Sequence, residues 1–196
     1  MFANRYTAFI DACALAGALK RNLLLTMAEA GFFRVRWSEK VLDETKRAIQ
    51  KILEAKNVPD AADRGVRAIG LMKEAFEDAM VSSYDDFLCV CDGLPDADDR
   101  HVLAAALKTQ AAIIVTDNAR HFPTEILGPL NVEACTSDEF IANTIALDTG
   151  KAVAAVRMMR ERLKNPEKSA EVLLLDMEVA GLLLTADLLR PEMQSL

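Results

Sequence analysis

The sequence contains few cysteines, histidines and aromatic residues. Its 196 residues include four cysteines, two histidines and one tryptophan. No two cysteines form a C-x-x-C pair, and the Cys-x-Cys spacing of Cys89 and Cys91 is not a zinc-binding spacing. The cysteine content is also far below that of a disulfide-stabilised secreted scaffold. We therefore expect a reduced, cytoplasmic protein.

Long hydrophobic runs and an excess of positive charge are also missing. No stretch without Asp, Glu, Lys or Arg exceeds eight residues, so no transmembrane helix is predicted. The apolar segment after Arg5 is interrupted by Asp11, which argues against a signal peptide. The 23 basic residues are outnumbered by 30 acidic ones, and the net charge is −7. This balance excludes a protein that binds nucleic acid through bulk positive charge, but not an enzyme with a local basic strip.

The apolar content of 52% is sufficient for a hydrophobic core, and the length fits one domain with or without a small appendage. The predicted strands cover residues 6–10, 32–37, 87–90 and 112–116, and the predicted helices cover residues 12–30, 38–55, 61–81 and 98–109. Strands that alternate with helices indicate βαβ units. The predicted fold class is therefore α/β, with a central parallel sheet.

Beyond about Thr136 the pattern becomes helical. Short helices are predicted over residues 137–148, 151–164, 166–177 and 178–189. Asn165 and Pro166 are well placed as the N-cap and first-turn proline of the third helix. We therefore predict a domain over residues 1–135 and a helical C-terminal extension over residues 136–196.

Acidic residues follow two of the predicted strands directly. Asp11 comes after the first strand, and Asp117 and Asn118 come after the strand that ends at Thr116. In open parallel sheets, ligands bind outside the carboxyl ends of the strands. Each acid also has a structural interpretation, since Asp11 can cap a helix and Asp-Asn is a good turn sequence.

Two further acids lie on the faces of predicted helices. Glu44 lies at the edge of an apolar stripe, where a carboxylate can still reach water. Helix capping explains Asp96 and Asp98, but Asp99 shares the inward face of its helix with apolar residues. Burial of a carboxylate costs several kcal/mol unless it is paired or bound to a cation.

These acids could meet at one end of the sheet. Like charges at close range need a counter-charge, and the sequence has no matching cluster of buried basic residues. A divalent cation with oxygen ligands, Mg²⁺ or Mn²⁺, would supply that charge. Such a site activates water and stabilises displacement at phosphorus, which indicates phosphodiester hydrolysis.

Four segments carry a resemblance to a known family. They are FIDACAL with Asp11, RWSEKVLDETKRA with Glu44, LPDADDRHVLAAAL with Asp99, and IVTDNARHFP. Over residues 6–123 the chain resembles PIN-domain ribonucleases, in particular the VapC-like toxins of bacterial toxin–antitoxin pairs. The helical extension is similar to one found on a branch of these proteins.

The resemblance implies a three-layer α/β/α fold and a metal-dependent endoribonuclease that uses Mg²⁺ or Mn²⁺ to cleave RNA. It implies that Asp11, Glu44 and Asp99 bind the metal. Asn118 stands at the position of the family's fourth acid, with Asp117, a further metal ligand, immediately before it. It also implies an antitoxin protein as partner and a homodimer or larger toxin–antitoxin assembly.

Three positions depart from the family pattern. Cys13 stands where related chains carry Asn, His121 where an Asp often precedes Phe-Pro, and Asn118 is a neutral form of the fourth acid. These departures keep open a catalytically weakened PIN-fold protein that acts through partner binding. A phosphotransferase of the haloacid-dehalogenase kind is disfavoured, because the second Asp that it uses is replaced by Cys13.

Other polar residues have simpler interpretations. Cys13 is expected to be a small buried residue rather than a catalytic thiol. His101 is predicted on the solvent side of its helix, and His121 in a solvated loop. Basic residues near the second strand and the following helix could bind RNA phosphates or simply face solvent: Arg34, Arg36, Lys40, Lys46 and Arg47.

Overall fold

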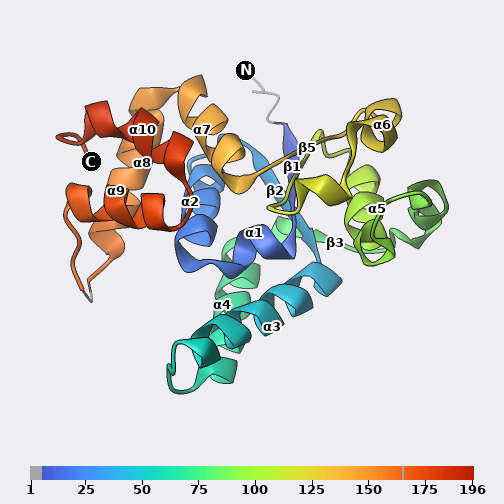
Figure 1. The fold of residues 1–196 in the computed structure, drawn as a ribbon, viewed down its shortest axis with the longest axis horizontal. Coiled ribbons are helices and arrows are strands. Elements are labelled where there is room, and N and C mark those ends of the chain that lie inside the picture. Colours follow the sequence, from blue (N-terminus) through green and yellow to red (C-terminus); the bar gives the residue numbers. More distant parts are fainter. Residues whose placement is uncertain (1–5, 165) are drawn as a thin grey trace.

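The structure is a computed structural model that describes residues 6–164 and 166–196. Its centre is a parallel sheet in the order β3-β2-β1-β4-β5 (Figure 1). The strands are β1 (Thr7–Ile10), β2 (Arg34–Ser38), β3 (Met80–Val81), β4 (Ile113–Val115) and β5 (Glu133–Cys135). The predicted α/β class with a parallel sheet is confirmed.

Strand β1 occupies the middle of the sheet because its side chains are apolar on both faces. Phe9 and Ile10 are fully buried, and Phe9 pairs with Arg36 of β2 on one side and Ile114 of β4 on the other. After the strand ends, the backbone N–H of Asp11 still donates to the carbonyl of Val115, at 2.9 Å. The residues that follow β1 and β4 therefore leave the sheet side by side.

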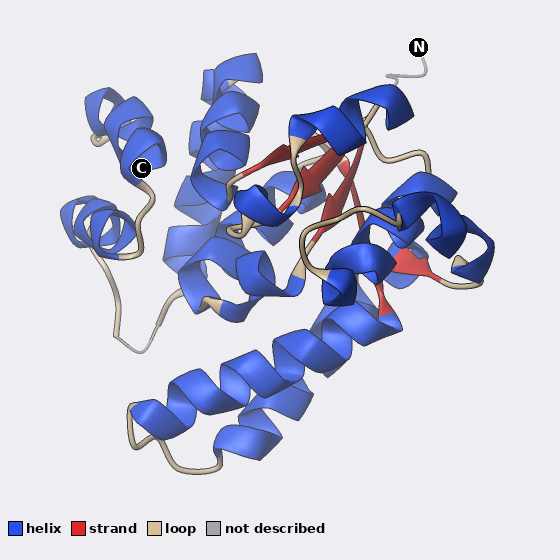
Figure 2. Cartoon of the chain, turned by 45° about the vertical axis from the view of Figure 1, so that its right-hand side comes forward, coloured by secondary structure: helices blue, strands red, loops and turns tan. Residues whose placement is uncertain are grey.

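The helix predicted over residues 12–30 is two helices, α1 (Ala12–Ala16) and α2 (Ala18–Glu29). The prediction of a single helix is wrong because Gly17 has extended backbone angles and ends α1. Figure 2 shows helices on both sides of the strands. Helix α5 (Arg100–Lys108) contacts β1, β2 and β4, whereas α2 and α3 (Glu39–Ala55) contact β2.

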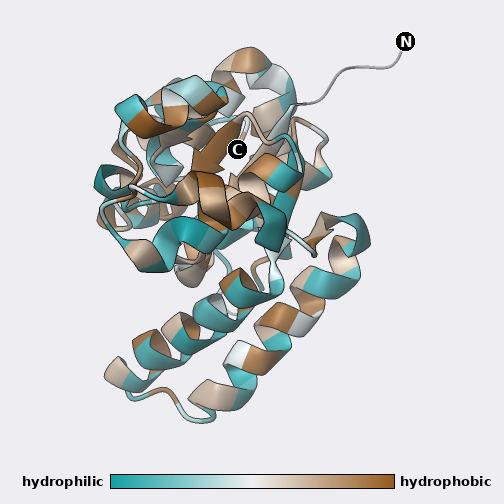
Figure 3. Cartoon of the chain, turned by 90° about the vertical axis from the view of Figure 1, so that its right-hand side faces the viewer, coloured by the Kyte–Doolittle hydropathy of each residue, from teal (hydrophilic) through white to brown (hydrophobic). Residues whose placement is uncertain are grey.

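Helices α3 and α4 (Ala61–Ala75) pack together and project from the sheet as a pair (Figure 2). Both alternate hydrophilic and hydrophobic residues (Figure 3), as expected of helices with one face buried. The Ser38 hydroxyl caps α3 by accepting from the Val41 N–H, at 3.3 Å, which confirms the predicted cap. Helix α4 ends earlier than predicted, and β3 lies within the range predicted as helix.

The sole tryptophan marks the core between the sheet and this helical pair. Trp37, in β2, is fully buried, and its ring lies edge-on to Phe76, with 5.9 Å between the ring centroids. Phe76 directly follows α4. The contact therefore joins the C-terminal end of α4 to strand β2 of the sheet.

The strand predicted over residues 87–90 is wrong. Residues Asp85–Cys91 form a 3-10 helix, η2, which packs against α5. Within this short run Phe87 and Leu88 are partly buried and Cys91 is fully buried, whereas Val90 is exposed. Further short helices are α6 (Thr124–Leu127), η1 (Glu77–Ala79), η3 (Ala97–Asp99), η4 (Ala119–His121), η5 (Gly128–Leu130) and η6 (Arg190–Glu192).

The C-terminal region is helical, as predicted. It contains α7 (Ser137–Leu147), α8 (Thr149–Arg162), α9 (Ala170–Val179) and α10 (Leu183–Leu189). Helix α9 begins later than predicted and is capped by Ser169, while the predicted cap at Asn165 lies outside the described residues. Helices α7 and α8 pack on α2, which joins this region to the sheet domain.

No helix in the described part of the chain is long and apolar enough to cross a membrane.

Candidate active site

Asp11 is fixed in place at the end of β1. Its Oδ1 accepts a hydrogen bond from the Ala12 N–H at 2.6 Å, and its Oδ2 accepts from the Thr116 hydroxyl at 2.7 Å. The predicted cap is thus real, since Asp11 is the N-cap of α1. The residue is only 5% exposed, yet no lysine or arginine within residues 6–164 and 166–196 forms an ion pair with it.

Cys13 belongs to the same network. Its Sγ lies 3.1 Å from Asp11 Oδ2 and 3.2 Å from Thr116 Oγ1, and it accepts from the Asp117 N–H at 3.1 Å. Burial and the charge of Asp11 raise the pKa of Cys13 to about 12. The thiol therefore stays protonated near neutral pH and donates to Asp11, which is unfavourable for a nucleophilic cysteine.

Asp99 lies in η3, directly before α5, and is 18% exposed. Burial raises its pKa, and the nearby carboxylates of Asp11 and Asp96 raise it further, against a hydrogen bond with His121 that lowers it. The charge of Asp11 thus acts on the carboxyl group of Asp99. The structure brings these two predicted site residues together.

His121 is part of this group, so the prediction of a solvated histidine is wrong. Helix η4 folds the loop after β4 back toward η3, and His121 Nδ1 lies 2.7 Å from Asp99 Oδ2 and 3.7 Å from Asp96 Oδ2. Asp96 also caps η3 by accepting from the Asp98 N–H at 2.9 Å, which confirms its predicted capping role. The sequence signals for this placement were that His121 comes shortly after Asn118 and stands where the family often has an Asp before Phe-Pro.

Glu44 reaches the same region through a histidine. It lies on α3, is partly buried as predicted, and its Oε1 is 3.3 Å from His101 Nε2. His101 follows Asp99 by two residues and is only 5% exposed, so the prediction of a solvent-facing histidine is wrong. The ring lies against Glu44 of α3, a contact between segments distant in the sequence that the pattern of α5 alone does not describe. Nδ1 of His101 is buried without a hydrogen-bond partner among the described residues.

Asp117 has a different environment. Its Oδ2 accepts from Lys20 at 2.7 Å, and its Oδ1 accepts from the Ser137 N–H at 3.1 Å. Burial opposes the shift, but these hydrogen bonds hold the pKa of Asp117 below its ordinary value. The next residue, Asn118, is exposed, and its N–H donates to Thr116 Oγ1 at 3.1 Å.

The basic residues near β2 fall into two groups. Arg36 donates to the carbonyls of Val35 and Asp78, and Lys46 pairs with Asp43 at 2.8 Å. Arg34, Lys40 and Arg47 are exposed. The exposed group is the one available to a negatively charged ligand.

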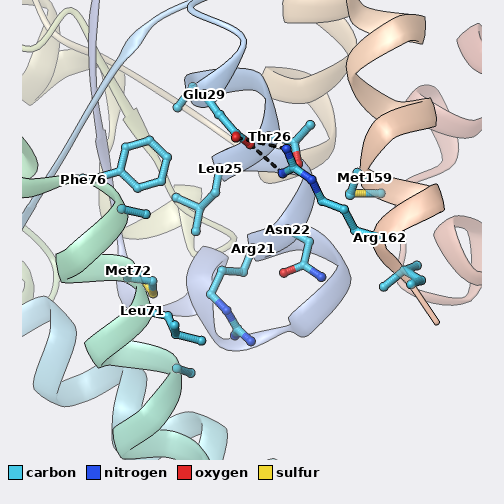
Figure 4. Close-up of a pocket in the computed structure, with 14 residues that line it drawn as sticks. Arg21, Asn22, Leu25, Thr26, Glu29, Leu71, Met72, Phe76, Met159 and Arg162 are labelled. Carbon is cyan, nitrogen blue, oxygen red and sulfur yellow. Dashed lines mark hydrogen bonds and ion pairs between the residues drawn. The ribbon is translucent and has the colours of Figure 1, made fainter. Parts of the chain in front are cut away.

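A cleft elsewhere contains none of the predicted site residues. It has a volume of about 750 Å³ and lies between α2, α4 and the end of α8 (Figure 4). Its wall is largely apolar, with Leu25 and Leu71 among the lining residues, and the ion pair between Glu29 and Arg162 lies at its edge. The chemistry-bearing side chains are therefore gathered at the carboxyl ends of the strands and not in this cleft.

Comparison with known families matches residues 7–120, more than half of the chain, to the PIN domain. The chain belongs to the PIN domain family. Residues 137–191 match the VapC50 C-terminal domain, so the PIN domain is followed by a second region that is also found in relatives.

One curated relative is "Putative ribonuclease VapC50" of Mycobacterium tuberculosis. It is 45% identical over 49 residues, which are 25% of this chain and 29% of that protein. The match therefore spans less than a third of the relative. No solved structure gives a significant match.

Proposed function

We propose that this PIN-domain protein is an endoribonuclease that hydrolyses RNA phosphodiester bonds with Mg²⁺ or Mn²⁺. Membership of the PIN family and the name of the relative support the proposal. The observation that carries it is the buried carboxylate of Asp11, which accepts hydrogen bonds only from neutral groups and has no lysine or arginine partner among the described residues. A second group of possible metal ligands, which includes Asp99, lies in the segment before α5 and the loop after β4.

These residues fit a divalent ion. The carboxylates of Asp11 and Asp96 help to raise the pKa of Asp99, and a cation between such groups would stabilise their charged forms. Carboxylate oxygens are also the ligands that Mg²⁺ and Mn²⁺ prefer. Asp11, Glu44 and Asp99 would hold the ion, with Asp117 or Asn118 as further oxygen donors. Such an ion would supply the charge that activates water and stabilises displacement at phosphorus.

The protein's own contribution is to orient these oxygens. The Ala12 N–H and the Thr116 hydroxyl each hold one oxygen of Asp11. His121 holds Asp99, and His101 holds Glu44. Fixed ligands lose little conformational entropy when they bind an ion or a substrate, so this network favours a preorganised site.

Exposed basic side chains provide a path for RNA. Lys40 and Arg47 lie on α3, the helix that carries Glu44, and would contact phosphates beside the acidic site. Arg34 begins β2, at the opposite end of the sheet from Asp11. Because the chain carries a net charge of −7, affinity for RNA would depend on this local strip. Binding should therefore weaken steeply as salt concentration rises.

The physiological role that we propose is that of the toxin in a type II toxin–antitoxin pair in the cytoplasm. The VapC50 C-terminal domain match and the relative support this role. The partners would be an antitoxin protein that covers the acidic site, and a second copy of the chain in a homodimer or larger assembly. A basic side chain of the antitoxin would compete with the metal for the carboxylates.

The direct test is RNA cleavage by the purified protein with Mn²⁺ or Mg²⁺, with and without EDTA. Asp11→Asn and Asp99→Asn should abolish cleavage, because each removes a charged ligand. Asp98→Asn is the matched control, since Asp98 is exposed and lies in the same turn as Asp99. Cleavage that persists in EDTA, or in both ligand variants, would contradict the metal mechanism.

A second candidate is a catalytically weakened PIN-fold protein that acts through partner binding. Two observations favour it: Asn118 is uncharged, and Asp117 is already paired with Lys20. This candidate predicts that the wild-type protein binds no divalent ion in calorimetry and cuts no RNA with either metal.

A further inference from the structure

A compact group of three metal-ligating side chains lies at the edge of the proposed site. One donor atom each from Asp96, Asp99 and His121 lies within 4.8 Å of the other two. His121 Nδ1 is 2.7 Å from Asp99 Oδ2 and 3.7 Å from Asp96 Oδ2. Ligand atoms bound at about 2.1 Å to a tetrahedral ion are about 3.4 Å apart, which is close to the spacing of His121 Nδ1 and Asp96 Oδ2. His121 Nδ1 and Asp99 Oδ2 are hydrogen-bonded, so they would have to separate by less than about 1 Å to share an ion.

The three side chains come from two short helices that face each other. Asp96 is the N-cap of η3, Asp99 is the last residue of η3, and His121 is the last residue of η4. Asp96 uses Oδ1 for its cap, which leaves Oδ2 on the side of the histidine. His121 is 22% exposed and Asp96 45%, so the group is open to solvent on one side. An ion can therefore reach it without unfolding either helix.

We propose that His121 is a nitrogen ligand that gives this site a preference for a transition-metal ion such as Zn²⁺ or Mn²⁺ over Mg²⁺. Imidazole nitrogen suits first-row transition ions, whereas Mg²⁺ prefers oxygen ligands only. Asp96 and Asp99 supply the oxygen ligands of the same ion. The inference rests on the proposed function, because Asp99 is shared with the metal site of the nuclease.

A purely positioning role for His121 predicts different behaviour. In that case Nδ1–H donates to Asp99, and the histidine orients the carboxylate without touching the ion. Both roles would lower RNA cleavage in a His121 variant. The test must therefore follow the imidazole itself.

Histidine-selective ¹⁵N labelling gives that readout, because the chain has only two histidines, His101 and His121. Zn²⁺ should shift the ring nitrogen signals of His121 at about one equivalent, and EDTA should restore them. Excess Mg²⁺ should leave these signals in place. The His121→Asn variant assigns the signals, and Asp98→Asn serves as the matched control for the acids.

Calorimetry with each metal tests the preference. His121→Asp replaces the nitrogen with oxygen and should lower the ratio of Zn²⁺ to Mg²⁺ affinity by about tenfold or more. Asp96→Asn should weaken Zn²⁺ binding, whereas Asp98→Asn should not. Circular dichroism of each variant establishes that a loss of binding is not a loss of folding.

The outcomes separate this inference from the proposed function. His121 signals that do not move at saturating Zn²⁺, or an unchanged metal preference in His121→Asp, would overturn the inference even if the protein cuts RNA with Mg²⁺. Conversely, a His121 signal that shifts in a protein that never cuts RNA would support the metal site and contradict the nuclease.

Discussion

The carboxyl ends of β1 and β4 lie side by side, and the aspartates that follow them have different hydrogen-bond and ion-pair partners. Asp11, after β1, accepts only neutral donors and repels Asp99. Asp117, after β4, is held by Lys20 and by the backbone of Ser137. One carboxylate is oriented but keeps its charge available, while the other has its charge matched within the protein.

The difference shows that position at a strand end does not by itself make a metal ligand. Helix α1 ends at Gly17, and α2 begins at Ala18. Lys20, in the first turn of α2, forms an ion pair with Asp117. No comparable basic side chain contacts Asp11 within the described residues.

The largest effect is expected on catalysis. Asp11→Asn should lower metal-dependent RNA cleavage by about 100-fold or more, because it removes a charged ligand. Asp117→Asn should lower it by less than about tenfold, since that charge is already paired with Lys20. Initial rates on one defined RNA, measured at several Mn²⁺ concentrations, make the comparison. Equal losses in the two variants would contradict it.

The second effect concerns metal and stability together. Mn²⁺ at 100 times its dissociation constant should stabilise the wild-type protein by about 2.7 kcal/mol, and Asp99→Asn should lose most of this gain. In EDTA, where no metal is bound, Asp99→Asn should instead be more stable than the wild-type protein by about 0.5–2 kcal/mol. The reason is that the substitution relieves the repulsion by Asp11 and Asp96. Urea unfolding with and without metal measures both differences, and Asp98→Asn should show neither.

The third effect removes the feature that distinguishes Asp117. Lys20→Met should lower the free energy of unfolding by about 0.5–1 kcal/mol, since it leaves a half-buried carboxylate without its cation. Lys40→Met, at an exposed lysine, is the matched control. A double-mutant cycle with Asp117→Asn isolates the pair. Additive losses would show that the two side chains do not stabilise each other.

The smallest effect is expected where a paired acid lies at the surface. The hydrogen bond from Arg162 holds the pKa of Glu29 below its ordinary value. Glu29 therefore stabilises the fold above its ordinary pKa, and this contribution is lost as pH falls through the lowered value. Because both side chains are more than half exposed, Arg162→Met should cost only about 0.2–1 kcal/mol at pH 7.

Thermal melts of Arg162→Met and wild type from pH 7 downward measure this difference, which should shrink with pH and in high salt. A difference that grew on acidification would be of the wrong sign for this ion pair.

The sequence predicted the parts of the fold that local patterns control. The buried run of β1, the Ser38 cap of α3 and the helical C-terminal region were all predicted correctly. The missed or misassigned pieces are short. Strands β3 and β5 have two and three residues, too few to show an alternating pattern, and η2 has the apolar content of a strand without a neighbour to pair with.

The site shows the same division. The positions of Asp11 at a strand end and of Asp99 on the inward face of its helix followed from local patterns in the sequence, and that they meet in one site was an expectation from the fold class. The contact of His101 with Glu44 of α3 and the contact of His121, in η4, with Asp99 each join segments that are distant in the sequence. No periodicity in the sequence describes how such segments are placed, so both histidines were assigned to solvent.

Trp37 gives the molecule a built-in optical reporter. Because it is the only tryptophan and lies against Phe76 in the sheet domain, indole fluorescence reports the unfolding of that domain and not the unfolding of α9 and α10. Far-UV circular dichroism, by contrast, follows every helix. A melt recorded by both signals would therefore reveal whether the C-terminal helices unfold together with the PIN domain or separately from it.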